Sequence, residues 1–340
     1  MSKRKLSRQQ RDRIDQRQAQ KVRDAANNSD SPGNDQRDTT AEFPGLVICH
    51  YGQQLDVEAL SGKHQGQLIR CHQRANLPPL VSGDRVIWQA EGEATGVVVA
   101  LTERRNVFSR PGFGGELKPV AANIDWLIIV LAPIPRAHRN LLDRYLVAAE
   151  TLGLRPVLLF NKSDLQAGNL AELDNIMSFY QSLGYAAERV SALQGSGIEA
   201  LRARLSGSTA VIVGQSGVGK SSLINALSPN LAAQVGALSE AGPKGTHTTT
   251  TVRLFHGETC DLIDSPGIRE FNLWHISAEQ LLAGFIEFRP WIGRCRFRDC
   301  QHRQEPHCAL QQAVLDGHIS AERMNSYQQI RNSLNSEGGA

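Results

Sequence analysis

The apolar residues of the chain follow two different spacings. From residue 43 to about residue 118, short apolar segments such as GLVICHYG, QLDVEAL, GQLIRCHQR, DRVIWQA and ATGVVVALTERRNVFSR recur with Gly, Pro and Asp between them. This spacing predicts about five strands, and five strands in so short a region are typical of an OB-like β-barrel. Such barrels often bind oligonucleotides, and the basic residues Arg104, Arg105 and Arg110 favour RNA here. The alternative is a barrel that only packs against its neighbour.

After residue 122 the pattern changes to apolar strands that alternate with amphipathic stretches. NIDWLIIVLAP and RPVLLF are predicted strands, and NLLDRYLVAAETLG between them is a predicted helix that ends at Gly153. Further along, a short strand ends at Val190, a helix begins near Gly197, and the strand TAVIVG leads into the helix KSSLINALS. This alternation predicts a doubly wound α/β domain with a mostly parallel sheet.

Charge and hydropathy narrow the class of protein. Residues 1–42 begin with a basic stretch and continue with almost no apolar residues, so we expect a disordered basic tail. The tail either solubilises the protein or is a flexible arm for phosphate-rich RNA, and we favour RNA. No run approaches the ~20 apolar residues of a membrane span, and no apolar stretch follows the basic start as a secretory signal would require. We therefore expect a cytoplasmic protein with no membrane partner, and a monomer because no long heptad repeat is present.

The stretch VIVGQSGVGKSSLINAL carries a nucleotide-binding motif. Gly214, Gly219, Lys220 and Ser221 satisfy G-x-x-x-x-G-K-[ST] between a predicted strand and a predicted helix. The glycines let the backbone N–H groups at a helix N-terminus surround phosphates, Lys220 adds charge near the β and γ phosphates, and the Ser221 hydroxyl ligates Mg²⁺. The predicted nucleotide-binding residues of this loop are Gly214, Gln215, Ser216, Gly217, Val218, Gly219, Lys220, Ser221 and Ser222.

Two earlier motifs concern the base. Asn161, Lys162 and Asp164, directly after RPVLLF, match the Asn-Lys-x-Asp pattern of guanine-nucleotide-binding proteins. By that resemblance, the Asp carboxylate accepts hydrogen bonds from the ring N–H and exocyclic amine of guanine, a donor pair that adenine lacks. An alternative interpretation of this motif, taken alone, is a structural Asn-Lys turn that is capped by Asp. Ser191 and Ala192 match the Ser-Ala element that braces the base, and their position after a predicted strand supports the guanine interpretation.

The segment after the phosphate loop supplies candidate switch residues. DLIDSPGIREF places Asp264 and Gly267 in an Asp-x-x-Gly element, in which Asp reaches Mg²⁺ through water and the Gly N–H meets the γ phosphate. Upstream, GPKGTHTTTTVRLF offers Thr248, Thr249 and Thr250 as the switch threonine that completes the Mg²⁺ shell. The sequence does not decide among the three, and we select Thr249.

The residue that orients the attacking water is not the usual one. Many GTPases have glutamine directly after Asp-x-x-Gly, but Ile268 occupies that position here and cannot orient water. His247, beside the switch threonines, is the nearest catalytic candidate, because a ring nitrogen could position water. The alternative is a histidine that only helps the loop to dock.

A cysteine-rich segment predicts a metal site. Cys295, Cys300, His302 and Cys308 form C-x₄-C-x-H-x₅-C, a set sufficient for a closed tetrahedral structural zinc site; His307 is a rival ligand that we rank below His302. Basic and aromatic residues around the ligands suit RNA phosphates and bases, with a solvated basic face as the alternative. These residues are Arg289, Trp291, Arg294, Arg296, Phe297, Arg298 and Arg303.

The order of the motifs is rotated, since the base-reading motifs precede the phosphate-reading ones. On GQSGVGKSSLINAL, HTTT and DSPGIREF, the chain resembles the RsgA family of ribosome small subunit-dependent GTPases, which are circularly permuted. The resemblance implies a multidomain protein with an N-terminal OB-like β-barrel, a central circularly permuted P-loop α/β GTPase domain and a mostly helical zinc-binding domain. The expected limits are 1–42 for the tail, 43–118 for the barrel, 119–274 for the GTPase domain and 275–340 for the zinc-binding domain.

The resemblance also implies a function. We expect a GTPase that binds the small (30S) ribosomal subunit through 16S rRNA and neighbouring proteins, acts in its late assembly, and leaves after hydrolysis that the subunit stimulates. The expected ligands are GTP and GDP, with one structural Zn²⁺ per chain and Mg²⁺ bound with GTP. Two alternatives stay open: an RNA-binding scaffold that holds nucleotide only structurally, and a GTPase that acts on another partner, such as a translation factor.

Overall fold

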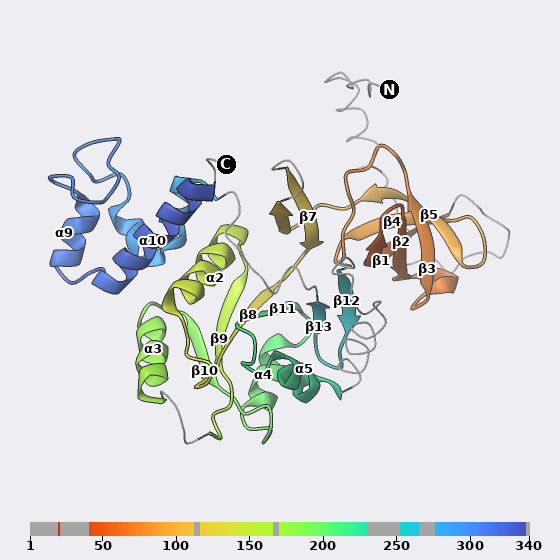
Figure 1. Cartoon of the computed structure of the whole chain (residues 1–340). Coiled ribbons are helices and arrows are strands. Elements are labelled where there is room, and N and C mark those ends of the chain that lie inside the picture. Colours follow the sequence, from red (N-terminus) through yellow and green to blue (C-terminus); the bar gives the residue numbers. More distant parts are fainter. Residues whose placement is uncertain are drawn as a thin grey trace. The chain divides into compact units, whose positions relative to one another are not determined.

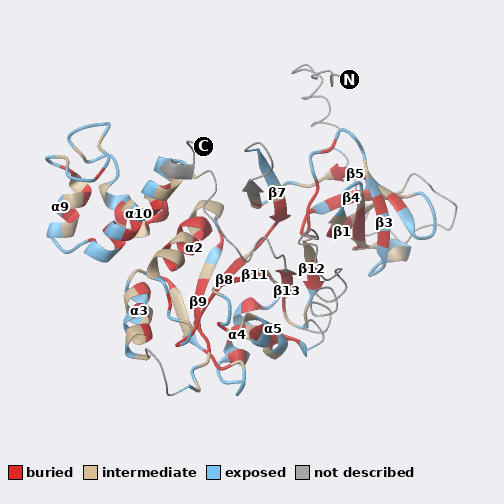
Figure 2. Ribbon diagram, viewed as in Figure 1, coloured by how far each residue is buried: buried red, intermediate tan, exposed pale blue. Residues whose placement is uncertain are grey.

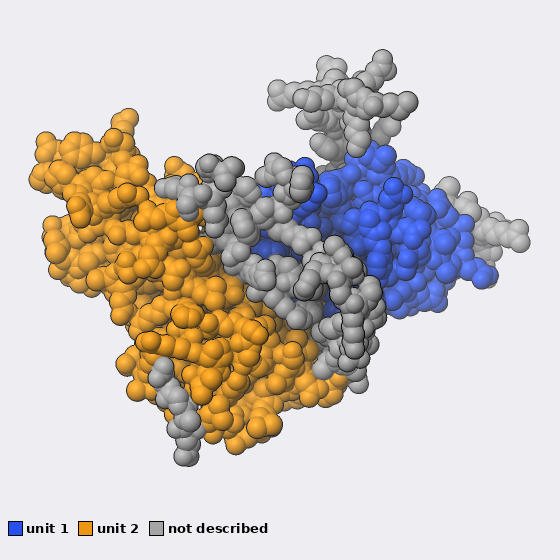
Figure 3. All heavy atoms as spheres, viewed as in Figure 1, with its two compact units in different colours: residues 1–124, 243–255, 263–265 blue, residues 125–242, 256–262, 266–340 orange. Residues whose placement is uncertain are grey.

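A computed structural model describes residue 20 and residues 41–111, 116–165, 170–229, 252–264 and 276–337 of the chain. Two compact units are distinguished (Figure 3): residues 1–124, 243–255 and 263–265 form the first, and residues 125–242, 256–262 and 266–340 form the second. The basic tail predicted for residues 1–42 lies outside the described residues, apart from residues 20, 41 and 42. Within the described ranges, no helix is both long and apolar enough to cross a membrane.

The first unit contains the predicted five-stranded barrel. Its strands are β1 (Glu42–Tyr51), β2 (Gln54–Ala59), β3 (Leu68–Gln73), β4 (Arg85–Ala90) and β5 (Thr95–Leu101), with a short helix η2 (Gly62–His64) between β2 and β3. The order β1-β2-β3-β5-β4 closes because β4 also pairs with β1. Alternate residues of each strand point inward, and Val47, Leu55, Ile69, Trp88 and Val98 are among those that form the core. The prediction of an OB-like barrel is confirmed (Figure 1).

The last predicted barrel segment, ATGVVVALTERRNVFSR, is two strands rather than one. β5 ends at Leu101, and β6 (Val107–Pro111) then pairs with β7 (Leu117–Ala122) in a separate antiparallel hairpin. Arg104 lies between β5 and β6, and its guanidinium donates to both carboxylate oxygens of the fully buried Asp84, each at 2.7 Å. This pair ties the connection between β5 and β6 to the residue that precedes β4. A further strand, β12 (Arg253–His256), pairs with β1 at Cys49 and Arg253.

The second unit is built on a parallel sheet with the strand order β10-β9-β8-β11-β13. These strands are β8 (Trp126–Leu131), β9 (Arg155–Phe160), β10 (Ala186–Arg189), β11 (Thr209–Val213) and β13 (Asp261–Asp264), the last beginning in this unit. β8 is buried along its whole length, as expected for a central strand with helices on both faces (Figure 2). The predicted doubly wound α/β fold is confirmed.

Helices cover both faces of this sheet: α2 and α3 lie on one side and α4 and α5 on the other (Figure 1). They span α2 (Arg139–Leu152), α3 (Leu170–Ser182), α4 (Ile198–Leu205) and α5 (Lys220–Leu227). In α2, Leu142, Tyr145, Leu146 and Ala149 are buried, which is the spacing of one helical face. α2 ends where the sequence predicts, because Gly153 adopts the left-handed conformation of a C-cap at φ 66°.

The C-terminal part of the second unit is mostly helical, as predicted. It contains α8 (Ala278–Gly284), η3 (Ile286–Trp291), α9 (Ala309–Leu315) and α10 (Ala321–Glu337). α8 begins at a capping box, in which the Ser277 hydroxyl accepts from the Gln280 backbone N–H and the Gln280 side chain returns to the Ser277 N–H. Both α8 and α10 pack on α2.

Candidate nucleotide site and metal centre

The predicted nucleotide-binding residues that the structure describes converge on one edge of the second unit's sheet. Asn161, Lys162 and Asp164 follow β9, Ser191 and Ala192 follow β10, and the loop that begins at Gly214 follows β11. Because these strands are parallel, their carboxyl ends meet at the same edge, which is where open α/β sheets bind ligands. Motifs far apart in the sequence thus surround one location.

The loop from Gly214 to Gly219 has backbone geometry that requires glycine at its two ends. Gly214 has φ 142°, and a Cβ there would lie 2.4 Å from the Val130 carbonyl oxygen; Gly219 has φ 94°, and a Cβ there would lie 2.3 Å from Asn161 Nδ2. No other residue fits at either position without displacing its neighbour. The Lys220 ammonium donates to the carbonyl oxygens of Gly214 and Gln215 at 2.8 and 2.7 Å, which draws the loop around the start of α5.

Asn161 joins the phosphate loop to the base loop. Its side chain is buried; Nδ2 donates to the Val218 carbonyl at 3.0 Å, and Oδ1 accepts from the Ala192 backbone N–H at 3.0 Å. Lys162 adds a second tie, since its ammonium donates to the Gly217 carbonyl at 2.6 Å. Sequence reasoning assigned Asn161 to the base motif but missed this bridging role, because the spacing of the motifs does not show which loop each side chain reaches.

The candidate guanine-reading carboxylate is held in orientation. The Ser191 hydroxyl donates to Asp164 Oδ1 at 2.5 Å and accepts from the Gln194 backbone N–H at 3.1 Å. The hydroxyl therefore fixes the plane of the carboxylate, and none of the described residues forms a hydrogen bond with Asp164 Oδ2. Chemically, the site combines exposed residues of a phosphate loop (Ser216, Gly217, Ser221 and Ser222) with an oriented acceptor for a base.

Several predicted residues lie beyond what the structure describes. His247, Thr248, Thr249, Thr250, Gly267 and Ile268 fall outside the described residues, as does the side chain of Asp264 at the end of β13. Their assignments remain predictions.

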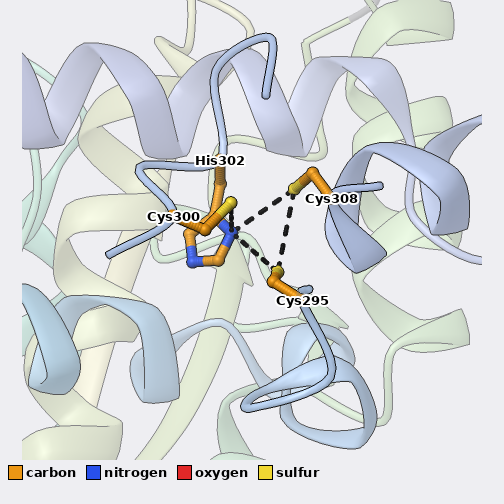
Figure 4. A group of neighbouring side chains, drawn as sticks. All are labelled: Cys295, Cys300, His302 and Cys308. Carbon is orange, nitrogen blue, oxygen red and sulfur yellow. Dashed lines mark hydrogen bonds between the residues drawn. The ribbon is translucent and has the colours of Figure 1, made fainter. Parts of the chain in front are cut away.

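The four predicted metal ligands meet in one cluster (Figure 4). His302 Nδ1 lies 3.5 Å from Cys295 Sγ, 3.5 Å from Cys300 Sγ and 3.4 Å from Cys308 Sγ, and the sulfurs of Cys295 and Cys308 are 3.9 Å apart. The residues come from the loops between η3 and α9, and Cys308 is the N-cap of α9. Among the residues that the structure describes, this is the one group with metal-ligand spacing, and His307 is not part of it.

The cluster fits a tetrahedral zinc ion. Ligand atoms about 2.0–2.3 Å from a tetrahedral Zn²⁺ lie about 3.5–3.8 Å from one another, close to the separations above. Ala309 N–H points at Cys295 Sγ at 3.4 Å, and the side chains of Gln311 and Gln328 donate to the His302 carbonyl at 2.9 and 3.2 Å. Burial, with a smaller contribution from nearby Arg331, lowers the pKa of His302 and so favours the neutral ring that binds metal. The remaining cysteines, Cys49, Cys71 and Cys260, are buried elsewhere.

The basic residues near the barrel and the metal cluster differ in what they contact. Arg104 and Arg105 bond within the first unit, Arg105 to the Asn123 carbonyl at 3.0 Å, so neither supports the RNA interpretation of the barrel. Arg110 has no described side chain. Around the cluster, Arg289 pairs with Glu150 at 2.5 Å and Arg303 donates to Asn332 at 2.8 Å. Arg294, Arg296, Phe297 and Arg298 are exposed as well, with Arg296 5.7 Å from the centre of the Phe297 ring.

Comparison with known proteins gives one consistent family. The RsgA GTPase family matches residues 101–274. The chain is 52% identical to the small ribosomal subunit biogenesis GTPase RsgA of Ectopseudomonas mendocina, covering 98% of both chains. The protein of the same name from Azotobacter vinelandii is also 52% identical, with the same coverage.

Solved structures agree with this family. YjeQ from Thermotoga maritima is 30% identical, with a TM-score of 0.69, over 86% of this chain and 99% of that one. YloQ, described as a circularly permuted GTPase, is 26% identical, with a TM-score of 0.68, over 89% and 99%. Together with the rotated motif order and the barrel, these identities and coverages show that the chain belongs to the RsgA family of circularly permuted GTPases.

Proposed function

We propose that this GTPase acts on the small ribosomal subunit during its late assembly, that the subunit stimulates hydrolysis, and that hydrolysis drives release. The observation that carries the proposal is the single site formed by the phosphate loop and the guanine-reading loop, which Asn161 joins through Val218 and Ala192. Support for the partner comes from the relatives, which are named small ribosomal subunit biogenesis GTPases and match over nearly their whole length.

Each part of the site would have a defined role with GTP. Asp164 would accept from guanine, Lys220 would exchange its contacts with the loop carbonyls for the β and γ phosphates, and backbone N–H groups of the loop would surround the phosphates. Ser221 and Thr249 would hold Mg²⁺, which neutralises phosphate charge when bound. Asp264 and Gly267 would sense the γ phosphate. Lys220 would make this exchange because carbonyl oxygens are weaker partners for an ammonium than phosphate oxygens are.

The C-terminal part would hold one structural zinc ion through Cys295, Cys300, His302 and Cys308. With that loop fixed, the exposed Arg294, Arg296 and Arg298 and the half-exposed Phe297 offer charge and a stacking surface for 16S rRNA and its neighbouring proteins. We further propose that the protein works as a cytoplasmic monomer.

Phosphate release should depend strongly on the partner. We expect slow release by the protein alone, because Ile268 cannot orient water, and release at least about tenfold faster with purified small subunits. The assay compares initial rates with no ribosomal particle, with small subunits and with large subunits as the matched control. Equal basal turnover in all three would favour another partner, and no turnover under any condition would favour a scaffold.

The His247→Ala variant should lose most of the stimulated rate, by about 100-fold, since general acid–base or water-positioning groups typically contribute that much. The affinity for GTP should stay unchanged, because the residue would act on water and not on the nucleotide. Single-turnover phosphate release on small subunits and GTP titration would be measured together, with His256→Ala, on the exposed end of β12, as the control. Retained stimulated turnover with unchanged GTP affinity would assign His247 to loop docking.

A further inference from the structure

A cavity lies beside the metal cluster in the C-terminal part of the second unit. Its volume is about 460 Å³, within the range of about 300–1,000 Å³ that holds small ligands in proteins. Three of the metal ligands also line it, but a zinc ion between them would take only a small part of the space, because its ligand atoms lie about 2.0–2.3 Å away. The lining residues from α8, α10 and the metal-binding loop include Leu282, Ile292, Phe297, Arg298, Asp299 and Tyr327.

The cavity is open to solvent, and its shape is set by the protein alone. Tyr327 is 1% exposed and lies at the floor, whereas Ile292 and Phe297, at 40% and 45% exposed, lie at the mouth. The metal-binding loop is fixed by Glu305, whose carboxylate accepts from two backbone N–H groups of that loop at 2.9 and 2.8 Å. A site that is already formed loses little conformational entropy when a ligand enters.

Two charged residues of the lining have no partner that neutralises them. Arg298 and Asp299 are exposed, and neither forms a hydrogen bond or an ion pair with any residue that the structure describes. With the Phe297 ring, the cavity therefore presents an apolar face, a positively charged donor and a carboxylate acceptor. These groups suit an unpaired nucleotide, since its base stacks on aromatic rings, its phosphate pairs with arginine and an exocyclic amine donates to a carboxylate.

The charge around the mouth favours RNA over a protein side chain as the occupant. Residues 289–303 contain five arginines and one acidic residue, Asp299. Arg294 and Arg296, close in sequence to the lining residues, are exposed. A phosphate backbone gains affinity on such a surface by releasing its counterions, whereas an apolar protein side chain gains nothing from the arginines.

We propose that this cavity binds one unpaired, amine-bearing base of an RNA strand. Phe297 stacks on the base, Arg298 contacts its phosphate, and Asp299 accepts a hydrogen bond from the exocyclic amine. Cytosine carries such an amine, whereas uracil carries a carbonyl oxygen at the same position, so the cavity discriminates between them. The inference rests on the proposed RNA partner and specifies the chemical group of that partner that the C-terminal part recognises.

The first test compares binding of the full chain to a fluorescent cytidine oligonucleotide and to an abasic oligomer of the same length and charge. The wild-type protein should bind the cytidine strand about tenfold more tightly, the size expected for stacking of one base. Phe297→Ala should lose most of this preference. The control Leu315→Ala should keep it, because Leu315 is 80% exposed on α9 but does not line the cavity. No preference in the wild-type protein, or the same preference in Phe297→Ala, would overturn the inference.

The second test concerns Asp299 and compares cytidine with uridine oligonucleotides of equal length. The wild-type protein should prefer cytidine by about fivefold, and Asp299→Ala should bind both strands alike, since the carboxylate that accepts from the amine is gone. Asp316→Ala is the matched control, because it removes one negative charge at the C-cap of α9, outside the cavity, and it should keep the preference. A cytidine preference that survives Asp299→Ala would contradict binding of the base in this cavity.

Folding and the proposed partner are checked separately from base recognition. Zinc content and melting temperature are recorded for every variant, and Phe297→Leu, which keeps apolar bulk without an aromatic face, replaces Phe297→Ala if that variant does not fold. Phosphate release with small subunits is measured on the wild-type protein. An unstimulated protein that still prefers cytidine through Phe297 would contradict the proposed partner and support the base-binding cavity. A stimulated protein whose base preference is independent of Phe297 would show the reverse.

Discussion

Replacing Asp164 with asparagine should change the preferred nucleotide from GTP to XTP. The carboxylate accepts two guanine donors, whereas the asparagine amide presents its own N–H groups to them, and xanthine offers a carbonyl where guanine carries its amine. Hydrogen bonds to a charged group contribute about 1.5–3 kcal/mol each, so GTP affinity should fall by about 100-fold or more while XTP affinity rises. The bond from Ser191 that orients Asp164 at 2.5 Å can be retained by the amide oxygen, which keeps the loop folded.

Competition of GTP and XTP against a fluorescent nucleotide would measure this change. Asp174→Asn provides the matched control, because Asp174 is a half-exposed residue of α3 that pairs with Arg189 at the surface. The control should retain the wild-type preference. An Asp164→Asn protein that still prefers GTP would remove Asp164 from base recognition and leave the Asn-Lys-x-Asp match as a structural turn.

Removing one zinc ligand should have the largest effect on stability. Cys308 is 3% exposed, caps α9, and lies closest to His302 Nδ1, so Cys308→Ala leaves three ligands around a buried position. Structural zinc contributes about 10–16 kcal/mol of apparent binding free energy, which is coupled to folding of the residues that hold it. We expect zinc content to fall from one ion per chain to nearly none, and the C-terminal helices to melt at lower temperature.

Elemental analysis of the purified chain and thermal unfolding would report the two effects. Cys260→Ala is the control, since Cys260 is also buried, at 6% exposed, but stands apart from the cluster. It should keep its zinc. A Cys308→Ala chain with full zinc content and unchanged melting would show that the metal, if bound, is held elsewhere.

Local patterns predicted much of the fold correctly. The apolar spacing of α2, with Gly153 as its stop, and the close alternation of short strands in the barrel are set by neighbours in the sequence, where helical and strand periodicity operate. The boundary between β5 and β6 was not predicted, and neither was the pairing of Arg104 with Asp84 in the connection between these strands. In the sequence Arg104 is indistinguishable from a solvated or RNA-binding arginine.

The functional and buried residues also separate into those that the sequence identified and those that it did not. The phosphate loop, the Asn-Lys-x-Asp turn and the four metal ligands could be identified from residue type and short spacing, because each is a local arrangement. Arg323 could not be identified as a buried residue. It lies in a polar helix, and its partner Asp143 is distant along the chain; no pattern in the sequence indicates that two opposite charges will be desolvated together.

The sequence by itself determined the class of nucleotide site, the permuted order of its motifs and the candidate metal ligands, since these depend on residues a few positions apart. Only the tertiary structure decided that Asn161 joins the two loops, that Arg104 and Arg105 are occupied within their own unit, and that Arg323 is buried against Asp143. These contacts depend on how elements distant in sequence pack, and packing chooses partners by shape and desolvation.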